Sequence, residues 1–122
     1  MTNHTHLIVA AQDDLTVSIR DFKHYTTTEV KKLLKLDNRH YILRLLEHSY
    51  SRKKGSEFQI WQRENYPETI TTDKFLVEKV DYLHNNPVVK GYVLKPEWWH
   101  YSSAGFYVGQ RACPVNLTYV FD

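Results

Sequence analysis

The sequence contains a single cysteine, Cys113, and no long hydrophobic run. One thiol cannot form a disulfide within the chain, which favours a reducing compartment. The longest apolar run, from Leu7 to Ala11, is far shorter than the roughly 20 residues that a helix needs to cross a bilayer. No charged leader with an apolar stretch precedes this run, so we expect a cytoplasmic protein without a membrane span.

Internal repeats, low-complexity tracts and long linkers are also absent. Hydrophobic residues make up 42% of the 122 positions and charged residues 25%, which are ordinary values for a folded domain. We therefore expect one domain over residues 1–122.

Net charge is small, at +2, but it is unevenly distributed. Residues 20–63 carry eleven Lys or Arg against five Asp or Glu, a net of +6, whereas the remaining residues sum to −4. A basic segment of this kind can neutralise phosphates, although a solvated helix face would have the same composition. The candidate phosphate contacts are Arg20, Lys23, Arg52, Lys53, Lys54 and Arg63.

Hydrophobic periodicity predicts a mixed order of strands and helices. A strand is expected over residues 4–11, then a helix from near Leu15 that the β-branched residues 26–28 could split. A second helix, which Asp37 could cap, is followed by a strand at 58–62 whose neighbour could include 69–71. Beyond Gly91 the chain is expected to be irregular and rich in aromatic residues. We rank core packing above base stacking for these rings.

Two histidines, His4 and His6, occupy alternate positions of the first predicted strand. Side chains two residues apart on a strand point to the same face, so the two imidazoles could share one divalent cation. An exposed polar strand edge would give the same spacing.

Tyr82 lies on a predicted helix that opens at Thr72 or Asp73. The apolar stripe of this helix consists of Leu76, Val80 and Leu83, and Tyr82 falls on a different face. Asn86, whose amide oxygen can bind a metal, follows one turn later, and we expect the next residue, a proline, to end the helix there. The alternative is a surface tyrosine followed by an asparagine cap.

Four blocks of the sequence resemble the single-tyrosine HUH transposases, in particular the branch of REP-associated tyrosine transposases. These blocks are Met-x-Asn-His-x-His-Leu-Ile-Val at 1–9, Phe-Gln-Ile-Trp-Gln at 58–62, Asp-Tyr-Leu-His-Asn-Asn-Pro-Val at 81–88 and Pro-Glu-Trp-Trp-His-Tyr-Ser-Ser at 96–103. The resemblance extends from residue 1 to about 107, and the block at 81–88 is its most specific part.

The resemblance implies an α/β (α+β) fold with a ferredoxin-like central antiparallel sheet and helices on one face. It implies cleavage and transfer of single-stranded, hairpin-bearing DNA through a covalent 5′-phosphotyrosine on Tyr82. His4, His6 and Asn86 would bind Mg²⁺ or Mn²⁺, which polarises the scissile phosphate.

Family members usually begin a few dozen residues earlier, with a strand and a helix ahead of the histidine strand. The resemblance therefore predicts an amino-terminally truncated sheet, which leaves three explanations: a start codon assigned too far downstream, a decayed mobile element, or a chain that completes the sheet by dimerisation. Family members act as homodimers.

Two other functions remain open at this level. A catalytically inactive relic would keep salt-dependent DNA binding and be indifferent to metal. A metal-dependent hydrolase would add Glu78 or Asp81 to the histidine pair and use water as the nucleophile. His84 lies off the Tyr82 face, and we expect His24, His40, His48 and His100 to be structural or solvated.

Overall fold

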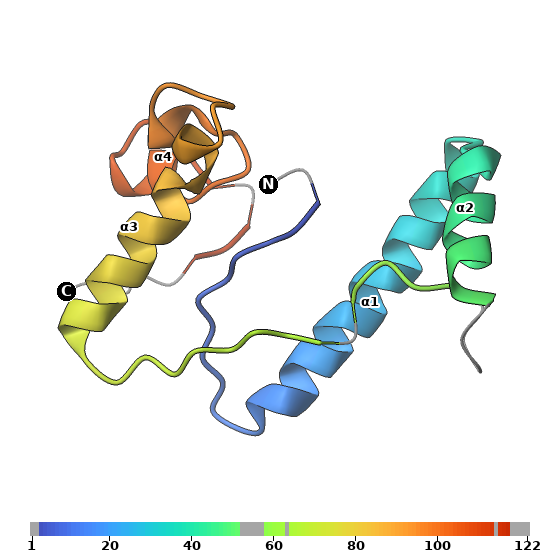
Figure 1. Cartoon of the computed structure of the whole chain (residues 1–122), viewed down its shortest axis with the longest axis horizontal. Coiled ribbons are helices and arrows are strands. Elements are labelled where there is room, and N and C mark those ends of the chain that lie inside the picture. Colours follow the sequence, from blue (N-terminus) through green and yellow to red (C-terminus); the bar gives the residue numbers. More distant parts are fainter. Residues whose placement is uncertain (1–2, 52–57, 63, 114, 118–122) are drawn as a thin grey trace. The chain divides into compact units, whose positions relative to one another are not determined.

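The computed structural model describes residues 3–51, 58–62, 64–113 and 115–117. The chain forms two compact units: a terminal unit made of residues 1–9 and 68–122, and a central unit made of residues 10–67. Figure 1 shows the elements of each unit in sequence colours.

The central unit contains two helices, α1 (Leu15–Leu36) and α2 (His40–Ser51). Asp14 caps α1, because its side chain accepts hydrogen bonds from the backbone amides of Thr16, at 2.7 Å, and Val17, at 3.4 Å. These hydrogen bonds, led by the one from Thr16, hold the pKa of Asp14 below its ordinary value. The side-chain hydroxyl of Thr26 donates to the Phe22 carbonyl at 2.8 Å, and the β-branched residues 26–28 lie within one continuous helix.

A tight turn at Asn38 separates the two helices. Asn38 adopts a positive φ of 55°, a conformation that asparagine tolerates better than most residues. The amide of Asn38 donates to the Lys35 carbonyl at 3.1 Å, and that of Arg39 donates to the Leu34 carbonyl at 2.8 Å. The expectation that Asp37 begins the second helix was wrong, because Asp37 is the C-cap of α1.

Residues 58–62 pack along α1 in the opposite chain direction. The indole nitrogen of Trp61 donates to the Thr26 hydroxyl at 2.8 Å, and its ring lies 5.7 Å from that of Phe22. Phe58, which is buried, lies further along the helix, with the ammonium of Lys31 5.0 Å from its ring centre. Side-chain packing on a helix, rather than pairing with another strand, therefore holds this segment.

No β-strand occurs among the residues that the structure describes, so the predicted ferredoxin-like antiparallel sheet is wrong. The segments expected to form strands, residues 4–11, 58–62 and 69–71, have no ladder of backbone hydrogen bonds. Alternation of polar and apolar residues is a local pattern, whereas a strand also needs a partner backbone at hydrogen-bonding distance. The helical part of the expectation is confirmed for α1, α2 and α3.

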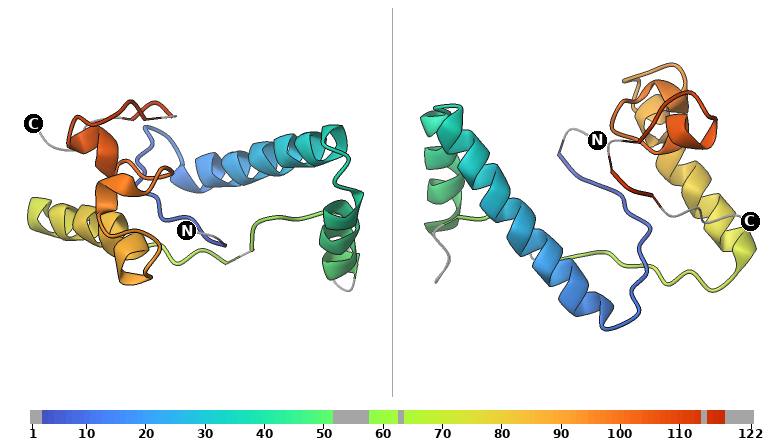
Figure 2. Two further views of the ribbon diagram at one scale, coloured as in Figure 1. Left: turned by 90° about the horizontal axis from the view of Figure 1, so that it is seen from above. Right: turned by 180° about the vertical axis from the view of Figure 1, so that it is seen from behind.

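The terminal unit is built on α3 (Asp73–Val89), followed by the short helices η1 (Pro96–Trp98) and α4 (Ala104–Tyr107). Figure 2 shows these elements in two further views. The Thr72 hydroxyl accepts a hydrogen bond from the Phe75 amide at 3.2 Å, as predicted for the start of this helix. Val80 and Ala104 are buried, at 8% and 4% exposure, and contribute to the apolar core of this unit.

The predicted end of α3 at Asn86 was wrong, because the helix continues to Val89 with Pro87 inside its last turn. Pro87 removes one backbone donor, but a favourable C-terminal motif follows directly. Gly91 has a φ of 73°, and its amide donates to the Val88 carbonyl at 2.8 Å. The Tyr92 amide donates to the Pro87 carbonyl at 2.9 Å, which completes a Schellman motif.

Arg111 holds together the segment that follows α3. Its guanidinium donates to the carbonyls of Trp99 and Ser102, the latter at 3.2 Å, and to a ring nitrogen of His100 at 2.9 Å. Gly105 leaves room for this side chain, since a Cβ atom there would lie 2.6 Å from the Arg111 Nε atom. In the part of the chain that the structure describes, no helix has the length and apolarity to cross a membrane.

Candidate functional site

The histidine pair lies on an extended segment of the terminal unit. The rings of His4 and His6 meet edge to face, with centroids 5.0 Å apart. The Nδ1 atom of His4 lies 2.8 Å from the side-chain oxygen of Asn3. Because that oxygen can only accept, Nδ1 donates, and the tautomer leaves the Nε2 lone pair of His4 for a ligand.

His6 carries a buried nitrogen, Nε2, that has no hydrogen-bond partner. An unpaired polar atom in a buried position is unfavourable unless something binds it. Burial lowers the pKa of His6 below its ordinary value of 6.5, and the positive charge of a protonated His4 would lower it further. His6 is therefore neutral near pH 7, which is the form that binds a metal.

Tyr82 projects from α3 toward the histidine pair. Its ring centroid lies 5.7 Å from that of His6, and the two rings are nearly perpendicular, at 84°. Tyr82 is 58% exposed, whereas Val80, two residues earlier, is buried. The prediction that Tyr82 lies off the apolar stripe is confirmed, and its side chain is open to solvent.

Asn86 follows Tyr82 by one helical turn and is buried, at 8% exposure. Its amide nitrogen donates to the Tyr82 carbonyl at 3.2 Å, which fixes the orientation of the amide group. The structure brings His4, His6 and Tyr82 into successive ring contacts, whereas Asn86 is linked to this group through the Tyr82 backbone.

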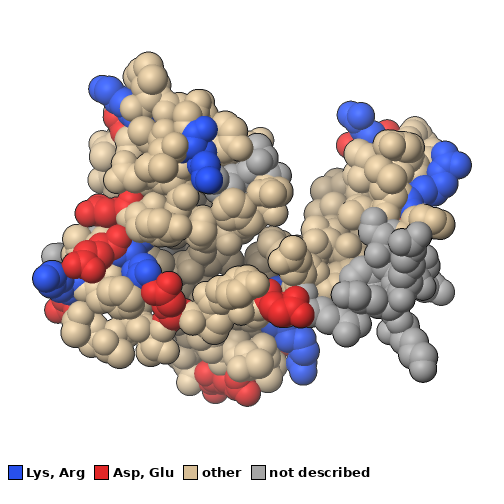
Figure 3. Space-filling view, in the orientation of Figure 1, with Lys and Arg blue, Asp and Glu red and all other residues tan. Residues whose placement is uncertain are grey.

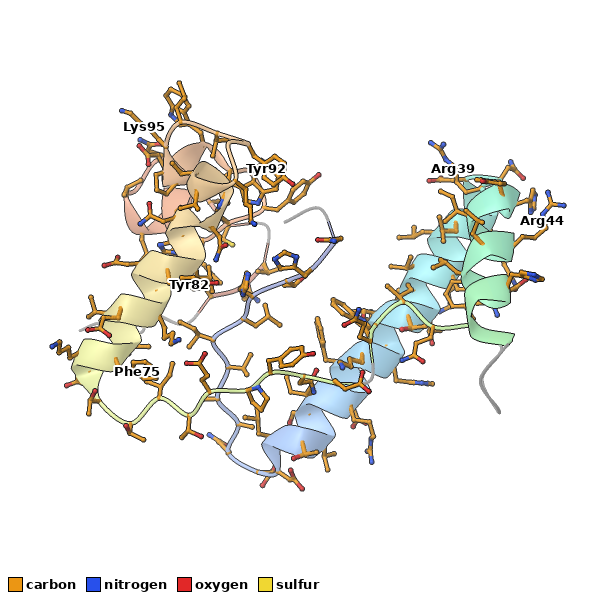
Figure 4. The ribbon with its side chains drawn as sticks, in the orientation of Figure 1. Arg39, Arg44, Phe75, Tyr82, Tyr92 and Lys95 are labelled. Carbon is orange, nitrogen blue, oxygen red and sulfur yellow. The ribbon has the colours of Figure 1, made fainter. Side chains whose placement is uncertain are left out.

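Lys79 is a residue of this site that the sequence reasoning did not single out. Its ammonium lies 4.9 Å from the ring centre of Phe75 and 5.8 Å from that of Tyr82, and it pairs with the Glu68 carboxylate at 2.5 Å. Figure 4 labels Phe75 and Tyr82 on α3, which are two turns apart. The signal was present in the spacing, because residues three and four apart on a helix are neighbours. Lys79 therefore places an ammonium that is paired with Glu68 beside the Tyr82 ring.

The other titratable residues of α3 do not join the histidine pair. Among the described residues, no three His, Cys, Asp or Glu side chains gather closely enough to hold a metal, so neither Glu78 nor Asp81 completes a carboxylate site. A nitrogen of His84 lies 2.8 Å from the Ser103 hydroxyl, and burial lowers its pKa, partly offset by Asp81. His84 therefore links α3 to the start of α4.

The candidate DNA contacts of the central unit fall into two groups. Arg20 pairs with Asp21 at 2.9 Å, and the Lys23 ammonium donates to the Gln62 carbonyl at 2.8 Å. Arg52, Lys53, Lys54 and Arg63 lie outside the described residues. Figure 4 labels two further basic residues, Arg39 and Arg44, at the α2 end of this unit.

One curated relative matches the chain over most of its length. The chain is 30% identical over 106 residues to a Haemophilus influenzae protein named "Putative REP-associated tyrosine transposase". The match covers 84% of this chain but only 54% of that protein, so the chain spans about half the length of this relative. No protein-family model matches the chain, and no solved structure does.

Proposed function

We propose that this chain belongs to the REP-associated branch of the single-tyrosine HUH transposases and cleaves and rejoins single-stranded DNA. The observation that carries the proposal is the contact between Tyr82 and His6, which come from segments 76 residues apart in the sequence. The similarity to a protein named as such a transposase supports the same conclusion.

His4, His6 and Asn86 are the residues that would hold Mg²⁺ or Mn²⁺. Their chemistry fits a divalent cation, because His6 offers a buried unpaired nitrogen and is neutral near pH 7. Two imidazoles and an amide oxygen are a modest ligand set for Mg²⁺, so we expect weak binding that DNA phosphate completes. Such a cation supplies Lewis-acid polarisation of the scissile phosphate.

Tyr82 is the proposed nucleophile. Its phenolic oxygen forms a bond to phosphorus while the bond from phosphorus to the 3′ oxygen breaks, which leaves a 5′-phosphotyrosine and a free 3′-hydroxyl. The phenol proton passes to solvent, to which Tyr82 is open, and the departing 3′ oxygen takes up a proton. The phosphodiester energy is kept, so another 3′-hydroxyl can reverse the step without ATP.

Lys79 and the basic central unit would assist binding rather than bond making. The ammonium of Lys79 lies on the Tyr82 face and would attract a phosphate that approaches the phenol. We expect the DNA substrate to form a hairpin. The resemblance also predicts that the chain forms a homodimer. Sedimentation velocity tests this oligomeric state.

Covalent capture tests the proposal. Labelled single-stranded hairpin oligonucleotides from the DNA that flanks the gene are incubated with the protein and Mn²⁺, then resolved on a denaturing gel. We expect an adduct that chelator and Tyr82→Phe abolish. Tyr41→Phe is the matched control, because Tyr41 is also exposed, at 70%, and lies on α2.

The rival functions give different results in the same assay. A DNA-binding relic gives salt-sensitive binding but no adduct with any variant. A hydrolase gives cut DNA without an adduct and keeps its activity in Tyr82→Phe. Either result contradicts the proposal.

A further inference from the structure

Several aromatic rings form one connected, exposed surface after α3. The Tyr92 and Trp99 rings are stacked, with centroids 5.6 Å apart and an angle of 25°. Tyr101 meets Trp99 edge to face at 6.4 Å, and His100 meets Tyr101 at 4.9 Å. We call Tyr92, Trp99, His100 and Tyr101 the aromatic surface.

This surface is more exposed than a packing role requires. Tyr101 is 80% exposed and Tyr92 47%, so neither ring is enclosed by the core. Trp98, next in the chain to Trp99, is also 54% exposed, and the ammonium of Lys95 lies 5.6 Å from its ring centre. Figure 4 labels Tyr92 and Lys95 in this part of the terminal unit. Large aromatic rings that are exposed side by side often mark a binding site.

The charge of the surrounding segment favours a polyanion. Residues 89–117 contain three Lys or Arg and one Glu, a net of +2, whereas residues 68–88 of the same unit have a net of −2. On the face shown in Figure 3, the part that contains η1 and α4 is mainly uncharged, and acidic side chains are more frequent along α3. Exposed rings interleaved with positive charge are the pattern by which proteins bind single-stranded nucleic acid.

The position of the surface relative to Tyr82 is also suitable. Seven residues separate Tyr82 from the end of α3 at Val89, which at 1.5 Å per residue corresponds to about 10 Å along the helix, and Tyr92 lies in the turn that follows. The Arg111 guanidinium holds the backbone on either side of His100 and Tyr101, through the Trp99 and Ser102 carbonyls. The backbone that carries Tyr101 is therefore held in place before any ligand arrives, which lowers the entropic cost of binding.

We propose that the aromatic surface is a base-stacking platform for single-stranded DNA, on which nucleotides near the cleaved phosphate stack against Tyr101 and Tyr92. This inference rests on the proposed function for the identity of the DNA but not for the stacking itself. Stacking on a ring requires a base but no particular base, so the platform would hold the strand without reading its sequence.

Binding of two matched oligonucleotides tests the platform. The probes are a 16-nucleotide oligothymidylate and an abasic strand of the same length, and fluorescence anisotropy is measured in chelator so that no cleavage occurs. We expect the full chain to bind the base-bearing strand more tightly. Tyr101→Ser should weaken that binding by about 5- to 150-fold, the range for losing one stacked base, and leave abasic binding unchanged.

Two further variants control for ring loss and for folding. Tyr101→Phe keeps the ring and should retain the affinity of the original chain. Tyr66→Ser removes a tyrosine that is 91% exposed in the central unit and should change neither probe's binding. Equal affinity for the two probes, or no effect of Tyr101→Ser, would overturn the platform.

The remaining outcomes separate this inference from the proposed function. Stacking without any Tyr82 adduct would support the platform and contradict strand transfer, whereas an adduct without base-dependent binding would overturn the platform alone. If Tyr101→Ser instead converts a dimer to a monomer with DNA affinity unchanged, a second copy covers the surface and the platform is wrong.

Discussion

The two units of this chain differ in how their side chains are used. In the terminal unit, Val80, Asn86 and Ala104 are buried, and the proposed nucleophile, Tyr82, projects from the same helix as two of them. In the central unit, Leu43 and Phe58 are buried, but α1 contains no buried residue, and apolar side chains such as Leu33, at 57%, remain exposed. A helix with buried residues, such as α3, can hold reactive groups at fixed distances, whereas a solvated basic helix such as α1 can contribute charge without fixed geometry.

The largest expected effect comes from removing the buried histidine of the terminal unit. His6→Ala deletes the nitrogen that lacks a partner and should lower Mn²⁺ affinity at least about 10-fold, because a ligand matters no less than the groups that orient it. Electron paramagnetic resonance of free Mn²⁺ measures this affinity. His40→Ala, an exposed histidine of α2, is the control, and an equal loss there would break the distinction between the units.

A matched pair of core and surface substitutions tests the difference in packing. Val80→Ala should lower the free energy of unfolding by about 1 to 2 kcal/mol, since it removes two buried methyl groups. Val17→Ala, on α1 and 39% exposed, should change it by less than about 0.5 kcal/mol. Urea unfolding followed by circular dichroism compares them, and similar losses would show that α1 is as well packed as α3.

The pH dependence of stability should also arise in the terminal unit. Burial lowers the folded-state pKa of His84 below its ordinary value of 6.5, so the unfolded chain binds more protons between these two values. The stabilisation is present above pH 6.5 and is lost as the pH falls through the folded pKa. His84→Gln should therefore flatten the fall in unfolding free energy between pH 7 and pH 5, and an unchanged slope would contradict this.

The smallest effect is expected from single charges of the central unit. Arg44→Gln should weaken binding of single-stranded DNA and reduce the slope of log affinity against log salt by about 0.7, the value for one phosphate contact. Lys74→Gln, in the acidic half of α3, should leave the slope unchanged. If Lys74→Gln reduces the slope and Arg44→Gln does not, the basic central unit does not make the electrostatic contact with DNA.

Local signals in the sequence predicted part of this structure. The Thr72 cap, the apolar stripe through Val80 and the separate face of Tyr82 all depend on residues within two helical turns, and all are confirmed. The contact between Tyr82 and His6 was predicted only through a resemblance, because no local pattern links two segments so far apart.

The errors have the same physical origin. A strand was predicted at 58–62 from alternation, but Trp61 and Phe58 pack on α1 instead, and no local pattern specifies such a partner. The end of α3 was predicted at Asn86 because a proline disfavours helical geometry at the residue before it, whereas Gly91 and its Schellman motif determine the end. Lys79 was not predicted, because a protonated lysine only donates hydrogen bonds and does not belong to a metal-binding pattern.

Mapping the site of covalent attachment tests the central claim most directly. The chain contains nine tyrosines, and peptide mass spectrometry of the adduct formed with Mn²⁺ and a hairpin oligonucleotide identifies the one that carries the phosphate. The proposed site predicts a nucleotide joined through its 5′ phosphate to Tyr82 and to no other tyrosine. An adduct on another tyrosine, or DNA cleavage with no attached nucleotide, would contradict the assignment of Tyr82 and the histidine pair as the reactive centre.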